Sequence, residues 1–228
     1  MSARVVILRP QPGAEATVEA ACALGLDALC YPLFSVEPMD WTPPDPAGFD
    51  ALMLTSANTI RHAGEGLARY AALPLFVVGE ATATVARRKG LNPVAVGSRG
   101  AEALIEAAHR SGHRHVLHLC GEDVVENIAE EPEVIRCAVY RAVKAGDAAG
   151  LAALLTPGGV VLVHSPRAGA RLAALTTPEQ RAALSLVAIS DRALAATGGG
   201  WACAKAAPMP QDSAMLALAQ ELCDNTAI

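Results

Sequence analysis

The chain has 228 residues, of which 52% are hydrophobic and 18% charged, so it can bury a sizeable core and is not a disordered protein. Its formal net charge of -5, without a long basic run, gives no electrostatic footprint for nucleic acid, and we expect no nucleic-acid partner. The apolar runs are strand-sized and fall short of the roughly 20 residues of a membrane helix, and the N-terminus lacks a signal-peptide pattern. We therefore expect a cytoplasmic protein without a membrane partner.

Residue patterns that would bind a metal or a nucleotide are missing. The six cysteines are scattered, with no C-x-x-C pair and no histidine at ligand spacing. Neither G-x-G-x-x-G nor a Gly-Lys-Ser/Thr segment occurs, and no Ser-His-Asp order is present. The six histidines fall mostly at predicted helix ends or strand margins, and the most notable, His164, has no obvious carboxylate partner. We therefore predict no metal site and no cofactor, and expect structural roles for the histidines.

Short β-rich runs alternate with helical patterns of roughly ten residues along the whole chain, which is the signature of βαβ units. The ten predicted strands cover residues 5–8, 28–31, 51–54, 75–78, 93–96, 115–119, 134–139, 160–163, 186–189 and 203–206. The fold class is therefore α/β with parallel sheets, and ten strands suffice for two five-stranded sheets. The proline-rich residues 38–46 predict a linker or lobe boundary, and residues 145–150 predict a second break.

The chain also shows internal similarity between segments that lie about 110 residues apart. A strand end at Leu54-Thr55-Ser56-Ala57-Asn58 has a counterpart at Val163-His164-Ser165-Pro166-Arg167, and each opens a helix. The following unit repeats as well, because residues 76–83 align with residues 186–193. Two lobes of similar fold would produce this pattern.

The polar and glycine-rich segments that could bind a ligand all follow predicted strands. In open parallel sheets, ligands bind beyond the carboxyl ends of the strands, where free N–H groups at helix starts can hold carboxylates or phosphates. The segments are Arg9-Pro10, Thr55-Ser56-Ala57-Asn58, Gly79-Glu80-Ala81-Thr82, Cys120-Gly121-Glu122, Ser165-Pro166-Arg167 and Ser190-Asp191. Ser56, Ser165 and Ser190 are equally well explained as helix N-caps, and the two roles are compatible.

The succession of these segments resembles the uroporphyrinogen-III synthase family across essentially the whole chain. The similar segments are Val6-Ile7-Leu8-Arg9-Pro10, Thr55-Ser56-Ala57-Asn58-Thr59-Ile60, Val78-Gly79-Glu80-Ala81-Thr82-Ala83, Leu119-Cys120-Gly121, Val139-Tyr140, Ser165-Pro166, Ala188-Ile189-Ser190 and the Ala-x-x-Pro of residues 204–208. Each motif is weak alone, and their order carries the resemblance.

The resemblance implies two flavodoxin-like lobes joined by two antiparallel crossing segments, one lobe being inserted into the other. Lobe 1 would comprise residues 1–34 and 142–228, lobe 2 residues 37–139, and the hinges would lie near residues 35–36 and 140–141. A cleft between the lobes would hold hydroxymethylbilane, a linear tetrapyrrole with eight carboxylates, without cofactor or metal. The family reaction loses the substrate hydroxyl as water, inverts the last ring through a spiro intermediate and closes the macrocycle. We expect a monomer.

The resemblance also implies roles for single residues. Tyr140 matches the family tyrosine proposed to assist departure of the hydroxyl, although a tyrosine at a strand end is equally explained by packing. The residues expected to bind substrate are Arg9, Thr55, Ser56, Ala57, Gly79, Thr82, Gly121, Ser165, Pro166 and Ser190. One departure stands out, because Ala193 occupies a position where the family usually has a threonine. Either that contact is dispensable, or the chain is a diverged member with weakened activity.

Two other classes of protein fit the same residues. The first is a non-catalytic two-lobed module that binds a small anionic ligand, since such modules share discontinuous α/β lobes. The second is a flavodoxin-like electron carrier, but the first strand leads into Arg9-Pro10-Gln11-Pro12 and not into a hydroxyl-rich phosphate loop. Tyr140 and Thr82 favour the synthase over the binding module.

Overall fold

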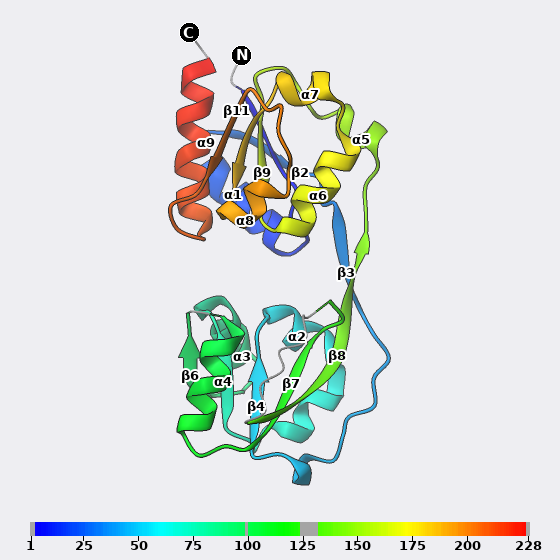
Figure 1. Ribbon diagram of the computed structural model, residues 1–228, viewed down its shortest axis with the longest axis vertical. Helices are drawn as coiled ribbons and strands as arrows, with labels where there is room; N and C mark the ends of the chain where they lie inside the picture. Colours follow the sequence, from blue (N-terminus) through cyan, green and yellow to red (C-terminus); the bar gives the residue numbers. More distant parts are fainter. Residues whose placement is uncertain (1–2, 99, 124–131, 227–228) are drawn as a thin grey trace. The chain divides into compact units, whose positions relative to one another are not determined.

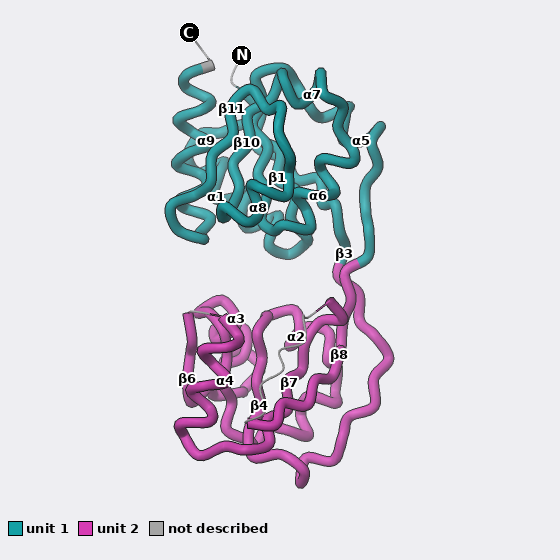
Figure 2. Tube along the Cα trace, in the orientation of Figure 1, with its two compact units in different colours: residues 1–35, 143–228 teal, residues 36–142 magenta. Residues whose placement is uncertain are grey.

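The structure, a computed structural model, describes residues 3–98, 100–123 and 132–226. The chain forms two compact units: unit 1 comprises Met1–Ser35 and Val143–Ile228, and unit 2 comprises Val36–Ala142 (Figure 2). The chain leaves unit 1 within strand β3 (Phe34–Pro38) and returns within strand β8 (Glu133–Lys144).

Unit 1 is built around a five-stranded parallel sheet in the order β11-β10-β9-β1-β2 (Figure 1). Its strands are β1 (Arg4–Ile7), β2 (Asp27–Cys30), β9 (Val160–Val163), β10 (Ser185–Ala188) and β11 (Cys203–Ala206). Its helices are α1 (Gly13–Ala23), α5 (Ala148–Ala152), α6 (Pro166–Leu175), α7 (Pro178–Ala182), α8 (Asp191–Ala195) and α9 (Asp212–Thr226). Read from β2, this is the 2-1-3-4-5 order of flavodoxin-like folds.

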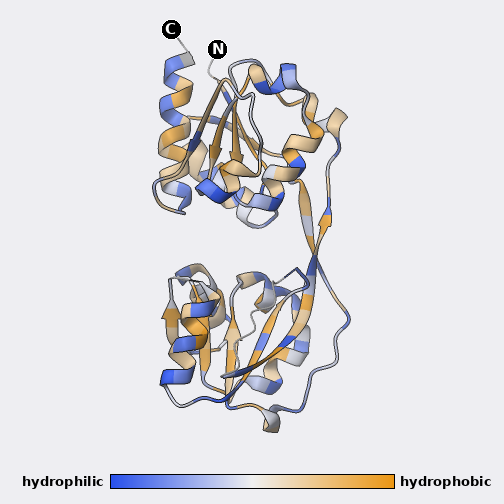
Figure 3. Cartoon of the chain, in the orientation of Figure 1, coloured by the Kyte–Doolittle hydropathy of each residue, from blue (hydrophilic) through white to orange (hydrophobic). Residues whose placement is uncertain are grey.

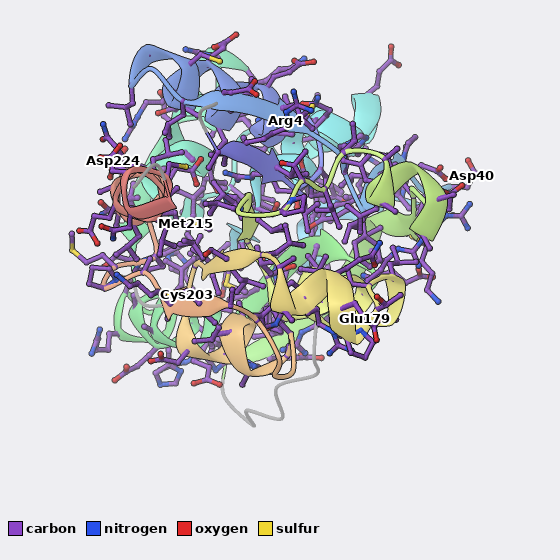
Figure 4. All side chains as sticks on the ribbon, turned by 90° about the horizontal axis from the view of Figure 1, so that it is seen from above. Arg4, Asp40, Glu179, Cys203, Met215 and Asp224 are labelled. Atoms are coloured by element: carbon purple, nitrogen blue, oxygen red, sulfur yellow. The ribbon has the colours of Figure 1, made fainter. Side chains whose placement is uncertain are left out.

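Both faces of this sheet are covered, which explains why its central strands are continuous apolar runs and not alternating ones. Every residue of β9 is buried. Helices α1 and α9 pack on one face, where Met215 of α9 is fully buried and Asp224 lies on the outer side (Figure 4). Helices α6 and α8 contact one another and strands β9 and β10.

Unit 2 contains a six-stranded sheet in the order β3-β8-β7-β4-β5-β6. Its further strands are β4 (Ala51–Leu54), β5 (Leu75–Val78), β6 (Pro93–Gly97) and β7 (His115–Gly121). Its helices are α2 (Ala57–His62), α3 (Glu80–Arg88) and α4 (Ala101–Arg110), with the 3₁₀ helices η1 (Pro46–Gly48) and η2 (Gly64–Tyr70). Helices α2 and α3 and η2 share an apolar cluster with one face of the sheet, and α4 packs on the other. Hydrophobic residues concentrate in the strands (Figure 3).

Strand β3 is absent from the ten strands predicted from the sequence, so the described residues hold eleven strands and the second sheet has six. Two backbone hydrogen bonds show that β3 and β8 are antiparallel: Met39 N–H donates to Val139 O at 3.0 Å, and Ala145 N–H donates to Leu33 O at 3.0 Å. Strand β8 is also longer than predicted, because it runs on to Lys144.

Arg171 of α6 binds the chain in unit 1 at both points where it crosses to unit 2. Its Nε donates to Leu33 O at 3.1 Å, and its Nη2 donates to Ala145 O at 3.0 Å and to Gly146 O at 2.7 Å. The guanidinium also lies 5.9 Å from the ring centroid of Phe34, which is buried. One side chain therefore fixes the last residues of unit 1 before the crossing and the first ones after it.

The two sheets have corresponding strand positions, in agreement with the internal repeat seen in the sequence. The order β2-β1-β9-β10-β11 matches β8-β7-β4-β5-β6 position by position. Strand β4 thus corresponds to β9 and β5 to β10, as the sequence alignment predicts. The following turns differ by one residue from that alignment, because Gly79 caps α3 where Ser190, and not Ile189, caps α8.

Candidate functional site

The residues predicted to bind substrate or to catalyse lie at the carboxyl ends of parallel strands in both units. Unit 1 carries Arg9, Ser165, Pro166 and Ser190, which follow β1, β9 and β10. Unit 2 carries Thr55, Ser56, Ala57, Gly79, Thr82, Gly121 and Tyr140, which follow or end β4, β5, β7 and β8.

The three serines predicted to bind substrate are helix N-caps, which the sequence analysis gave as their alternative role. Ser56 Oγ accepts from Asn58 N–H at 3.2 Å, Ser165 Oγ accepts from Ala168 N–H at 3.2 Å, and Ser190 Oγ accepts from Ala193 N–H at 3.3 Å. Pro166 occupies the first position of α6, where its missing N–H costs nothing. Each cap uses one helix-start amide, so the capped helices offer a ligand fewer donors than an uncapped start would.

Helix α3, like α1 and α4, begins without a side-chain cap, and its own N-cap is Gly79, which has no side chain. Gly79 has φ 80°, a conformation that glycine adopts without steric cost, and its own N–H donates to Gly97 O at 2.8 Å. The N–H groups of Glu80, Ala81 and Thr82 are the first three of the helix and have no partner within it. This turn can therefore bind an anionic oxygen through backbone amides.

Thr82 and Ala193 occupy equivalent positions, as the third residues of α3 and α8. Both are buried: Thr82 is 5% exposed and Ala193 is 0% exposed. Helices α8 and α6 pack closely at this position, because a Cβ added to Gly169 would come within 2.8 Å of Ala193 O. The threonine that the family usually has at position 193 would thus replace a methyl group inside this packing.

Arg9 does not project freely from the end of β1, because it pairs with Asp212 at the start of α9. Its Nη1 lies 2.8 Å from Asp212 Oδ2 and 3.3 Å from Thr17 Oγ1, and Thr17 Oγ1 donates to Asp212 Oδ2 at 2.6 Å. Burial alone would raise the pKa of Asp212, but hydrogen bonds from His164 and Thr17 and the charge of Arg9 lower it to about 2. The cation is therefore compensated by a carboxylate in its own unit.

His164 belongs to the same group of residues and has the carboxylate partner that the sequence did not reveal. Its Nε2 lies 3.4 Å from Asp212 Oδ1, and its side chain is 5% exposed. Burial lowers the pKa of His164 against the opposing effect of Asp212. The ring is thus a buried, largely neutral group that packs at the end of β9.

Tyr140 and Gly121 are brought together by the pairing of β7 with β8. They are direct register partners just past a β-bulge, and Glu122 N–H donates to Tyr140 O at 2.9 Å. The tyrosine ring lies over the glycine, since a Cβ on Gly121 would come within 2.7 Å of Tyr140 Cζ. His62 of α2 contacts the same ring, with a centroid separation of 6.1 Å. Within the described residues the Tyr140 hydroxyl has no hydrogen-bond partner, so it can donate to a ligand.

Thr55 is hydrogen-bonded to a histidine that was not among the predicted site residues. His118 lies in the middle of β7, is 1% exposed, and places its Nε2 3.1 Å from Thr55 Oγ1. Burial, assisted by the charge of Arg136, lowers the pKa of His118 to about 4. A lone polar residue inside the apolar run of residues 116–121 was the signal that could have revealed it.

These groups suit binding and hydrogen-bond donation, and not nucleophilic or metal chemistry. Burial raises the pKa of Cys120, which ends the apolar part of β7, to about 11, so its thiol stays protonated at neutral pH. Across residues 3–98, 100–123 and 132–226, no group of three or more histidine, cysteine or acidic side chains is placed to hold a metal ion. In the same residues no helix has both the length and the apolarity to cross a membrane.

Comparison with known families connects this arrangement to a function. Residues 15–217 match the family model described as uroporphyrinogen-III synthase HemD. The chain belongs to the uroporphyrinogen-III synthase family. The match includes both strand-end sets except Arg9, and it confirms the resemblance seen in the sequence.

Solved structures of the family share the fold of this chain. The uroporphyrinogen-III synthetase of Helicobacter pylori 26695 is 17% identical, with 96% of this chain and 99% of that chain covered and a TM-score of 0.66. A mutant uroporphyrinogen III synthase of the extremely thermophilic bacterium Thermus thermophilus is 17% identical, with 98% and 100% covered and a TM-score of 0.56. A comparison with curated protein sequences gave no match. At these identities the structures support the two-lobed α/β fold alone.

Proposed function

We propose that this chain cyclises hydroxymethylbilane to uroporphyrinogen III, with loss of water and inversion of the last pyrrole ring, as a lyase of tetrapyrrole biosynthesis. The observation that carries this proposal is the family match over residues 15–217, which spans ten of the eleven expected site residues. The substrate would be the only small-molecule partner, and the reaction would need no cofactor or metal.

The strand ends supply donors for the carboxylates of such a substrate. The open amides at the start of α3 and the hydroxyl of Thr55 are hydrogen-bond donors in unit 2, and they need no basic side chain to attract an anionic oxygen. Holding a flexible tetrapyrrole in one conformation removes rotational freedom, which can contribute several kcal/mol to the barrier of ring closure. Arg9 would contribute indirectly, because its charge is already paired with Asp212.

Tyr140 would donate a proton or hydrogen bond to the departing hydroxyl. Its ring is held between Gly121 and His62, and its phenol is free of partners among the described residues. Pyrrole nitrogens can expel hydroxide with modest assistance, so loss of the phenol should slow the reaction without abolishing it.

A coupled assay tests the function and the role of Tyr140 together. Hydroxymethylbilane is generated in place, the products are oxidised, and the porphyrin isomers are separated. We expect type III product above the uncatalysed background, and a kcat about ten- to a hundredfold lower in Tyr140→Phe. Tyr31→Phe is the matched control, because the Tyr31 hydroxyl bonds the backbone of Asp147 in unit 1. Equal rates for Tyr140→Phe and wild type would remove Tyr140 from the mechanism.

One observation favours a second candidate, a non-catalytic module that binds a small anionic ligand. Ala193 replaces the usual threonine, so the start of α8 lacks that threonine hydroxyl and keeps the Ser190 hydroxyl, which caps the helix. Type I porphyrin alone in the coupled assay would select this alternative. We further propose a cytoplasmic monomer without a nucleic-acid partner, in keeping with the net charge of -5, and light scattering of the purified protein tests the oligomeric state.

A further inference from the structure

His118 is a buried polar side chain in the middle of an otherwise apolar strand. It shares a face of the unit 2 sheet with Val116, which packs into the apolar cluster of Met53, Phe76 and helix α4. Its register partners are Met53 of β4 on one side and Arg136 of β8 on the other. A polar group in such surroundings costs free energy unless it is hydrogen-bonded, so its partner matters.

That partner is the hydroxyl of Thr55, one residue beyond the end of β4. The two side chains meet at 3.1 Å through His118 Nε2 and Thr55 Oγ1. Thr55 is only half-buried, whereas His118 is 1% exposed. The other ring nitrogen, Nδ1, is buried and has no hydrogen-bond partner among the described residues.

These contacts determine which ring nitrogen carries the proton. The ring is neutral at physiological pH, because burial and the neighbouring Arg136 lower the pKa of His118. A neutral imidazole has one N–H donor and one acceptor. Placing the proton on Nδ1 would bury a donor without a partner, which is rare and costly in proteins. Placing it on Nε2 lets the ring donate to Thr55 and leaves only a lone pair unpaired.

An Nε2–H that donates to Thr55 Oγ1 also orients the threonine. The hydroxyl proton of Thr55 cannot point at a nitrogen that is itself a donor, so it turns away from His118. The hydroxyl proton is then available at the strand end to a hydrogen-bond acceptor other than the ring. A carboxylate oxygen is a suitable acceptor, because hydrogen bonds to a charged oxygen are stronger than those to a neutral one.

We infer that His118 is a positioning residue that makes Thr55 a dedicated hydrogen-bond donor toward a carboxylate oxygen of the substrate. This inference rests on the proposed function, because it takes Thr55 to contact the substrate. His118 itself touches no substrate atom and acts through the orientation of the threonine hydroxyl.

The protonation of the ring can be measured without any enzyme activity. In protein labelled with ¹⁵N-histidine, long-range proton–nitrogen correlation spectra distinguish a protonated from an unprotonated ring nitrogen. We expect the His118 signals to show Nε2–H and unprotonated Nδ1 at neutral pH. A ring protonated on Nδ1 overturns the inference, whether or not the chain is a synthase.

Kinetics test whether the orientation matters to the substrate. His118→Leu removes the donor, and His118→Gln is the matched variant that keeps an N–H donor; each is made with Thr55 and with Thr55→Val. We expect His118→Leu to raise KM about tenfold, with kcat little changed and with most of the loss restored by glutamine. In the Thr55→Val background, neither change at position 118 should alter KM further.

Other outcomes have distinct meanings. An equal rise in KM from His118→Leu in both backgrounds overturns the inference, because the histidine would not act through Thr55. The fluorescence of Trp41, which lies in unit 2, separates this result from simple loss of folding. A wild-type protein that makes only type I porphyrin refutes the proposed function and with it the role toward that substrate, while the spectra still decide the orientation of Thr55.

Discussion

Acid should weaken unit 2 through His118, independently of any substrate. An ordinary histidine has a pKa of 6.5, and that of His118 is about 4 in the folded protein. Between these values the unfolded chain binds a proton that the folded unit does not. The stability contributed by the neutral ring is therefore fully present above about pH 6.5 and is lost as the pH falls toward 4. The difference between the two pKa values corresponds to about 3 kcal/mol of unfolding free energy.

The assay is urea unfolding of unit 2 at two pH values. Trp201→Phe leaves Trp41 as the single tryptophan, and Trp41 reports on unit 2 because it stacks on Tyr70 there. Lowering the pH from about 7.5 to 5 should cost the chain with His118 about 2 kcal/mol more than the His118→Gln chain. Every other titrating group is present in both proteins, so its contribution cancels.

The result that would refute this reasoning is an equal loss of stability in the two proteins. It would mean that His118 is protonated as easily in the folded unit as in the unfolded chain. The neutral ring, and the Thr55 orientation that depends on it, would then be wrong. A larger loss in the glutamine variant would have the same meaning.

Three further predictions concern other contacts. Arg171→Lys keeps the charge but loses the forked hydrogen bonds to three carbonyls, so unit 1 should lose about 2 kcal/mol of unfolding free energy. The fluorescence of Trp201, the tryptophan of unit 1, measures this in urea, and no loss would contradict the role of Arg171 at the crossing points. Gly121→Ala should displace the Tyr140 ring and lower the rate of type III formation about tenfold, whereas Gly66→Ala, with a similar clash in unit 2, should not. Asp212→Asn should cost unit 1 about 1–2 kcal/mol at neutral pH after allowance for solvent screening, a difference that is present above pH 3.8 and vanishes as the pH falls toward 2. Urea unfolding at both pH values checks it, and a constant difference would contradict it.

The fold was largely predictable because parallel strands buried on both faces leave continuous apolar runs such as residues 51–54 and 160–163. Strand β3 was missed for the opposite reason. Its residues Phe34-Ser35-Val36-Glu37-Pro38 alternate weakly and lead into a proline-rich stretch, so their pattern does not mark a strand, and only the family resemblance implied a crossing segment there.

The candidate site likewise has parts that could be predicted from the sequence and parts that could not. Strand-end positions follow from topology, and the serine caps follow from local sequence. The pairing of Arg9 with Asp212 could not be predicted, because the two residues lie 203 positions apart and nothing local marks them as partners. The hydrogen bond from His118 to Thr55 could not be predicted either, because it depends on the register of β4 against β7.

The position-by-position match of the two sheets has a consequence for how the chain is assembled. Strands β1, β2, β4, β5 and β6 make one complete set of five positions, and β7 to β11 make a second set. Each sheet nevertheless takes two strands from one set and three from the other, as in a domain-swapped dimer whose subunits have been fused end to end. A cut in the loop between α4 and β7 would thus give two halves, neither of which contains either sheet. Only the two fragments together could restore both.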